Sequence, residues 1–281
     1  PGSWATVNSM NTAREELAGC GIASAALAFG GVASGTRLRN TESYNGTNWT
    51  EVNDLNTERS LLAGAGTTTS ALAFGGNAPP TGRAETELWN GTNWTEVNDL
   101  NTGRERLAGA GANNTAALAI GGEVPAGPTV AITELWNGTN WTEVNDLNTA
   151  IQFFAAVGTT TAALAFGGEP PATDKTETWN GTNWTEVNDL NTARSKLAGA
   201  GTTTSALAFG GTPIASKGGL TESWNGTNWT ELNDLNTPRE TPSGAGSNNT
   251  SALAFAGKGP GVTAATEEWV AGPTTATIGD S

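Results

Sequence analysis

Short apolar runs separated by polar turns recur along the whole chain. The tryptophans of a repeated Asn-Trp-Thr-Glu motif, at positions 49, 94, 141, 184 and 229, lie 43 to 47 residues apart. Each period contains four runs, which in one copy are residues 62–66, 70–75, 86–89 and 94–97. Runs of this length, bounded by Gly, Asn and Thr, predict β-strands, and a period of roughly 40 to 50 residues is typical of propeller blades. We therefore expect an all-β fold of four-stranded antiparallel blades.

The runs within a period differ in composition. The third and fourth are joined by Asn-Gly-Thr-Asn at 90–93, and Asn-Gly is a strong hairpin signal because both residues tolerate positive φ. The first run consists mainly of Gly and Ala, whose small size suits the place where blades converge, so we place it next to the axis. Cys20 lies in this run, where other copies have Ala65, Ala110, Ala200 and Ala245. We interpret it as a small buried residue, with a reactive thiol as the alternative.

Counting the runs predicts six blades. The second run ends six times, at Phe29, Phe74, Ile120, Phe166, Phe209 and Phe255, and the third ends six times in an aromatic residue. A copy of the fourth run, residues 4–7, precedes all other runs, and the last copy has no fourth run after Trp269. We expect residues 4–7 to pair with residues 266–269 and close the ring, which protects the exposed edges.

The chain is interpreted as one domain, residues 1–281, with residues 1–3 read as a cloning remnant and 274–281 as a C-terminal tail. It has no run of about 18 apolar residues, which predicts a soluble protein without membrane insertion. The near-identical copies are compatible with an extracellular or virion-associated protein on a microbial or viral surface.

The order of the motifs resembles the kelch repeat. One copy shows it as Gly75-Gly76, Trp89, Trp94 and Arg104, and the resemblance covers nearly the whole chain. Two departures are Ile151, where Arg is expected, and Ala256, which replaces one Gly of the pair. The resemblance implies that one face and the central mouth bind acidic peptides or small ligands.

Alternating strand direction puts two kinds of connection on each face of the ring. The connections from strand four to one and from strand two to three share a face, and the second kind varies from copy to copy. These variable loops are residues 32–40, 77–84, 123–132, 169–175, 212–220 and 258–265. Variable loops on a rigid ring are suited to binding, so we expect the binding site on this variable face.

An arginine recurs just before each innermost strand except at Ile151. The candidate ligand-binding residues are Arg14, Arg59, Arg104, Arg194 and Arg239, which could hold carboxylates in bidentate contacts. The alternative is that each locks neighbouring blades through a repeated acid. The candidate partners are Glu42, Glu87, Glu134, Glu177, Glu222 and Glu267, or Asp54, Asp99, Asp146, Asp189 and Asp234. Ile151 would then mark a weaker blade junction.

The eleven tryptophans suit either of two roles. They could stack on sugars and make a multivalent lectin, or they could pack between blades, which their strict repetition favours. The Asn-Gly-Thr and Asn-Trp-Thr triplets match the N-glycosylation pattern, and we interpret them as hairpin turns.

Charge and composition narrow the function further. The net charge of −14 disfavours nucleic acid and anionic lipid as partners. The absence of His removes most triad and zinc chemistry, so we expect no catalytic residue, no metal and no cofactor. A carboxylate-dependent glycoside hydrolase and a calcium-binding protein are the alternatives. The leading hypothesis is a non-enzymatic, monomeric propeller whose variable face recognises a protein or glycan.

Overall fold

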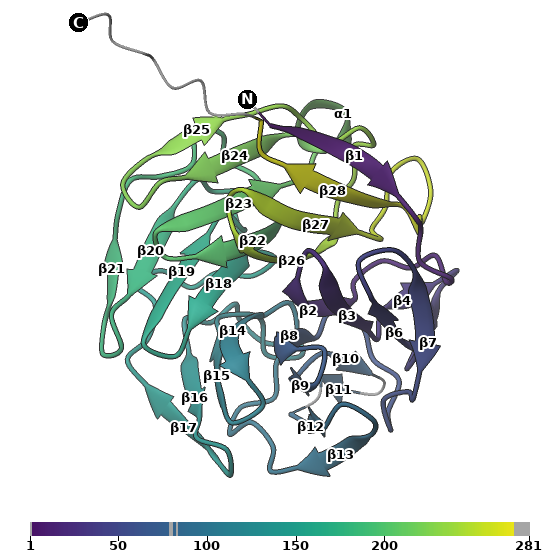
Figure 1. The fold of residues 1–281 in the computed structure, drawn as a ribbon. Coiled ribbons are helices and arrows are strands. Elements are labelled where there is room, and N and C mark those ends of the chain that lie inside the picture. Colours follow the sequence, from purple (N-terminus) through teal and green to yellow (C-terminus); the bar gives the residue numbers. More distant parts are fainter. Residues whose placement is uncertain (1, 79–80, 83, 273–281) are drawn as a thin grey trace, which may run out of the picture.

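The computed structural model describes residues 2–78, 81–82 and 84–272, which form six four-stranded antiparallel sheets around an axis (Figure 1). The predicted all-β, six-bladed propeller is confirmed. No helix in the described part of the chain is long and apolar enough to cross a membrane.

The blades follow one another along the chain, and each contributes its strands in the order inner to outer. Blade 1 contains β2 (Ala18–Ile22), β3 (Ala25–Phe29), β6 (Thr41–Tyr44) and β7 (Trp49–Val52); blade 2 contains β8 (Ala63–Thr67), β9 (Ser70–Phe74), β12 (Thr86–Trp89) and β13 (Trp94–Val97). Blade 3 contains β14 (Ala108–Asn113), β15 (Ala116–Ile120), β16 (Thr133–Trp136) and β17 (Trp141–Val144); blade 4 contains β18 (Ala155–Thr159), β19 (Ala162–Phe166), β20 (Thr176–Trp179) and β21 (Trp184–Glu186). Blade 5 contains β22 (Ala198–Thr202), β23 (Ser205–Phe209), β24 (Thr221–Trp224) and β25 (Trp229–Glu231); blade 6 contains β26 (Ser243–Asn248), β27 (Ser251–Phe255), β28 (Thr266–Val270) and β1 (Ser3–Val7).

The ring closes through the N-terminal strand, as expected. In Figure 1 the purple β1 lies beside the yellow β28, with Trp4 opposite Trp269 and Val7 opposite Thr266. Gly2 and Ser3, read as a cloning remnant, take part in this closure: Ser3 belongs to β1, and the carbonyl of Gly2 accepts a 2.8 Å hydrogen bond from Asn233 Nδ2. The tail expected at 274–281 lies outside the described residues.

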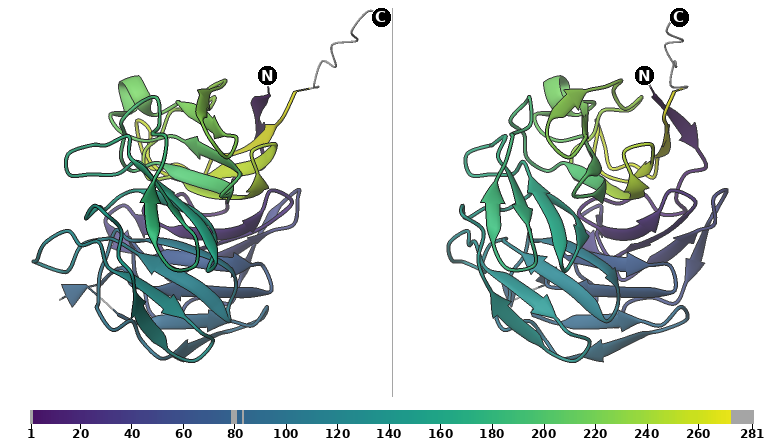
Figure 2. Two further views of the ribbon diagram at one scale, coloured as in Figure 1. Left: turned by 90° about the vertical axis from the view of Figure 1, so that its left-hand side faces the viewer. Right: turned by 60° about the vertical axis from the view of Figure 1, so that its left-hand side comes forward.

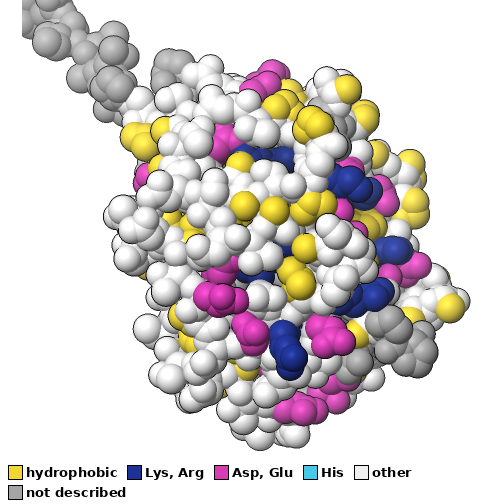
Figure 3. Space-filling model, turned by 90° about the vertical axis from the view of Figure 1, so that its right-hand side faces the viewer, with side chains coloured by type: hydrophobic (Ala, Val, Ile, Leu, Met, Phe, Trp, Pro, Cys, Tyr) yellow, Lys and Arg dark blue, Asp and Glu magenta, His cyan; other side chains and the backbone are white. Residues whose placement is uncertain are grey.

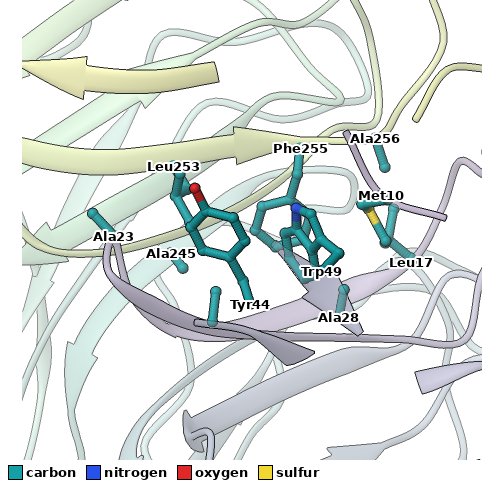
Figure 4. Close-up of a cluster of buried hydrophobic side chains, with 11 residues drawn as sticks. Met10, Leu17, Ala23, Ala28, Tyr44, Trp49, Ala245, Leu253, Phe255 and Ala256 are labelled. Atoms are coloured by element: carbon teal, nitrogen blue, oxygen red, sulfur yellow. The ribbon is translucent and has the colours of Figure 1, made fainter. Parts of the chain in front are cut away.

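The hydrophobic core lies between successive blades. Figure 4 shows one such cluster, in which Phe255 of blade 6 packs against Trp49 of blade 1 with ring centroids 5.0 Å apart. The indole of Trp49 also donates a 3.1 Å hydrogen bond to Thr266 Oγ1 of blade 6. Bonds of this kind, 2.9 to 3.1 Å long, link each blade to the preceding one all around the ring. All eleven tryptophans are buried, which agrees with their interpretation as packing residues.

Glycine in the innermost strands allows this close approach. A Cβ built on Gly64 would come within 2.5 Å of Phe29 Cζ in the preceding blade, so a larger residue would displace the ring. Blade 4 has Ala156 at the matching position, and the preceding blade there carries the shorter Ile120 in place of Phe. Cys20 is buried in the inner strand of blade 1, and burial raises the pKa of its thiol to about 12, so it stays protonated at neutral pH.

Short elements decorate one face of the ring. Two hairpins, β4–β5 (Val32–Ala33, Thr36–Arg37) and β10–β11 (Asn77–Ala78, Thr81–Gly82), and the one-turn helix α1 (Ile214–Lys217) belong to the variable loops. The connection before β2 pairs with the first of these loops through Glu15 and Val32, so the two kinds of connection share this face as predicted. Figure 2 shows these loops extending to one side of the blades.

Candidate ligand-binding site

The five candidate arginines lie beneath the variable face. Arg14, Arg59, Arg104, Arg194 and Arg239 are all 0% exposed. Each forms an ion pair with a repeated glutamate of strand three in the blade that follows it, namely Glu42, Glu87, Glu134, Glu222 and Glu267 respectively. The structure thus places the arginines in a buried scaffold, so we leave them out of the candidate site.

The ion pair between Arg104 and Glu134 illustrates this scaffold. Arg104 Nη2 lies 3.1 Å from Glu134 Oε1, and its other bonds reach the carbonyl oxygens of Ile132 and Ala119. The second carboxylate oxygen of Glu134 accepts bonds from the backbone and side-chain nitrogens of Asn101. Burial lowers the pKa of Arg104, while the carboxylate of Glu134 raises it. These contacts attach the connection from blade 2 to the body of blade 3.

The repeated aspartates have a different role from the one weighed for them. Asp54, Asp99, Asp146 and Asp189 each accept a hydrogen bond, 3.0 to 3.3 Å long, from the backbone nitrogen at the start of strand three. They therefore fix the end of the variable loop onto the blade.

A ring of six residues with positive φ surrounds the axis on the variable face. Glu16, Leu61, Arg106, Phe153, Lys196 and Thr241 have φ values of 49° to 59°. Five successive backbone hydrogen bonds, 2.7 to 3.0 Å long, run around this ring from the nitrogen of one residue to the carbonyl of the one before. Residues other than glycine rarely adopt this backbone conformation. Here the hydrogen bonds between neighbouring blades hold it in place. We call these six residues the mouth ring.

The mouth ring surrounds a pocket at the axis that is open to the solvent. Its floor is apolar, formed by the residues that follow the ring positions: Leu17, Leu62, Leu107, Phe154, Leu197 and Pro242. An apolar floor with a few polar groups at the rim is typical of a ligand-binding site.

Two cations flank one aromatic ring at the rim of this pocket. Arg106 Cζ lies 5.1 Å and Lys196 Nζ 5.4 Å from the centroid of Phe153, within the range of cation–π attraction. Carboxylates hold both cations: Arg106 pairs with Glu105 and Glu123, and Lys196 with Glu240 at 3.5 Å. The rim thus presents a pre-positioned cationic and aromatic surface.

Glu16 is the acidic member of the mouth ring. Partial burial raises the pKa of its carboxyl group, and the charges of Arg106 and Lys196 oppose that rise. It is therefore an acid held in a partly desolvated place, as is common at binding sites.

Among the described residues, the Lys and Arg side chains that reach the surface belong to the variable face. Apart from the five buried arginines, every Lys and Arg in the sequence belongs to the mouth ring or to a variable loop: Arg37, Arg39, Arg83, Arg106, Lys175, Lys196, Lys217 and Lys258. In the side view of Figure 3, basic side chains lie next to acidic ones, mostly toward the side that carries these loops. Within the described residues, no group of three or more Asp, Glu or Cys side chains could hold a metal ion.

Sequence reasoning predicted a binding site on the variable face but did not predict the mouth ring. A signal was present: the ring position lies two residues after the repeated Arg, and the six copies carry six different residues there. Nothing in the sequence indicated that these residues have positive φ or that all six lie around the axis.

Comparison with known proteins adds no relative. No protein-family model matches the chain, and no significant match is found among curated proteins.

Proposed function

We propose that this protein is a non-enzymatic binding propeller that holds a protein ligand at the mouth ring of its variable face. The observation that carries the proposal is the contrast within the repeat. Six symmetry-related positions around the pocket carry an acid, two different cations, an aromatic, an aliphatic and a hydroxyl residue, whereas the floor position that follows each of them is Leu in four copies, Phe in one and Pro in one. A purely structural ring would have no need for this diversity, because the backbone bonds of the mouth ring do not depend on the side chains.

The chemistry of the mouth supports a protein ligand over a sugar. Aromatic and arginine side chains are enriched where proteins bind one another, and Phe153 and Arg106 meet at the rim. A lectin that stacks sugars on tryptophan would need an exposed indole, and all eleven indoles are buried. We further propose that the blades are kelch-like, on the order of their motifs, and that the ring acts as a monomer.

The test is a binding screen with matched variants. Labelled protein is screened against a displayed peptide library and a glycan array, with and without calcium. We expect saturable binding to a peptide class, weakened at least tenfold by Phe153→Ala and by Arg106→Ala. Thr68→Ala, in a turn on the opposite face, is the control and should bind as the unchanged protein does.

Two outcomes would contradict the proposal. If the Phe153→Ala and Thr68→Ala variants both bind with the affinity of the unchanged protein, the ligand does not bind at the mouth ring. Binding to one sugar class alone would make the protein a lectin.

A further inference from the structure

The junction between blades 3 and 4 departs from the other junctions in several linked positions. Ile151 replaces the buried arginine, Ile120 replaces phenylalanine and Phe154 replaces leucine or proline, and all three belong to one core cluster. The cluster fills the interface with apolar atoms, and Ile151 packs against Gly168. This cluster contains no charged residue that would replace the positive charge of the arginine.

The acceptors that hold the arginine elsewhere are retained in blade 4. In blade 1 the guanidinium of Arg14 donates to Glu42 Oε1 at 3.2 Å and to the carbonyl oxygens of Asn40 and Ala28 at 2.9 and 3.4 Å. The same strand register in blade 4 puts Glu177 opposite Ala165, as Glu42 lies opposite Ala28. The equivalent acceptors are therefore Glu177 Oε1 and the carbonyl oxygens of Lys175 and Ala165.

Glu177 has a buried carboxylate. Its Oε2 accepts bonds from the backbone and side-chain nitrogens of Asn148, at 2.9 and 2.7 Å. Among the described residues, no Lys or Arg forms an ion pair with it. The nearby Lys175 instead binds Glu186 and Asp189, at 2.5 and 3.0 Å. A buried charge without a partner is costly, so this site favours a cation.

A narrow pocket opens onto this carboxylate. Its lining includes Ile151, Ala165, Lys175 and Glu177. Ala165 is 5% and Glu177 6% exposed, whereas their counterparts in the other blades are 0% and at most 1% exposed. The enclosed part of the pocket is about the size of one water molecule. Solvent therefore reaches the place that a guanidinium seals in the other five blades.

We propose that this pocket in blade 4 binds a monovalent cation of the size of potassium or ammonium, in place of the missing arginine. A single positive charge neutralises Glu177 as the guanidinium does in the other blades. Carbonyl and carboxylate oxygens are suitable ligands for such an ion. A divalent ion would bring a second positive charge, which the single carboxylate of Glu177 would leave uncompensated. No mouth-ring residue lines this site, and the proposal does not rest on the function proposed at the mouth.

The experiment measures thermal unfolding of the whole protein in different chloride salts at constant total chloride. The reference cation is tetramethylammonium, which is too large for the pocket, and potassium, ammonium and sodium are titrated against it. Because an ion that binds only the folded state stabilises it, Tm should rise by about 3 °C for each tenfold increase above Kd. Potassium and ammonium should act at lower concentrations than sodium.

Two variants give the matched controls. Ile151→Arg supplies the guanidinium from the chain and should abolish the dependence on the cation. Glu177→Gln keeps an acceptor for Asn148 but removes the charge, so it should unfold at a higher temperature than the unchanged protein in tetramethylammonium, and the gap should narrow in potassium. Equal Tm values in all four salts, or the same salt response in Ile151→Arg, would overturn the proposal.

A direct observation keeps the proposal falsifiable if a variant does not fold. Crystals of the unchanged protein soaked in thallium(I), a potassium mimic, should show an anomalous peak between Glu177 and the carbonyl of Ala165. Ordinary water density there without an anomalous peak would overturn the site.

Discussion

The two faces of the ring are built from the same repeat but differ in what varies. On the constant face, the turn between strands three and four reads Asn-Gly-Thr-Asn at 45–48, 90–93, 137–140, 180–183 and 225–228, without a charged residue. On the variable face the loops differ in length and sequence, and they carry hairpins, a helical turn and the exposed cations. One repeat therefore contains a turn that is identical in five copies and a loop that differs from copy to copy.

Hydrogen bonding explains why the constant face is constant. Asn90 Oδ1 closes its own turn by accepting bonds from the nitrogens of Thr92 and Asn93, both at 2.9 Å. Asn53 of the preceding blade donates to Thr92 O and to Asn93 Oδ1, at 2.9 and 2.8 Å. Equivalent bonds recur between blades, so these amides serve both the turn and the junction. The Asn-Gly-Thr triplets thus lie in turns, as interpreted from the sequence, whereas the Asn-Trp-Thr triplets begin in the turn and continue into strand four.

The variable face gains its freedom from the layer beneath it. The buried ion pairs and the aspartates at the start of strand three anchor the ends of each loop, so the residues between are free to change. Three predictions test how far the two faces depend on these different supports.

The largest effect is expected below the variable face. Arg104→Met leaves the carboxylate of Glu134 buried without its cation, which should cost about 3 to 5 kcal/mol of unfolding free energy. Thermal denaturation should show a fall in Tm on the order of 10 °C. The double variant Arg104→Met/Glu134→Gln should recover part of the loss. If Arg104→Met left Tm unchanged but abolished ligand binding, Arg104 would be a ligand-binding residue and not a structural one.

A smaller effect is expected on the constant face. Asn90→Ala removes both bonds that close its turn, and we expect a loss of about 1 kcal/mol in denaturant unfolding. Thr36→Ala, at an exposed position in a variable loop, is the matched control and should change stability by less than about 0.5 kcal/mol. If both variants lost the same unfolding free energy, the hydrogen bonds of the Asn-Gly-Thr-Asn turn would not explain why that turn is constant.

The smallest effect concerns the mouth ring and has the opposite sign. The pKa of Glu16 is raised in the folded protein, so the ionised form is disfavoured there and stability falls as pH rises through this pKa. Glu16→Gln should therefore have a slightly higher Tm than the unchanged protein at pH 7. The difference should vanish near pH 4, below the ordinary pKa of glutamate. A Tm difference that is constant from pH 4 to 7 would show that ionisation of Glu16 is not its cause.

The sequence by itself determined the number of blades, the strand order and the closure of the ring. Blade identity is encoded locally, in turn residues and in the regular spacing of Trp and Phe, and residues 4–7 match the fourth run that is missing after Trp269. Such local patterns can be recognised from the sequence because each blade repeats the same turn and strand residues at nearly the same spacing.

Only the tertiary structure decided which polar residues line the mouth pocket and which are buried beneath it. The arginines recur at the same position of each repeat, which is compatible with a binding role and with a structural role. Their burial depends on how strands from adjacent blades cover them, so it was established only by the folded ring. The mouth ring and the Glu177 pocket arise in the same way, from residues far apart in the chain that meet at the axis or at a blade junction. Sequence periodicity reports what repeats, whereas a site is made where the repeat is broken and the fold brings the exceptions together.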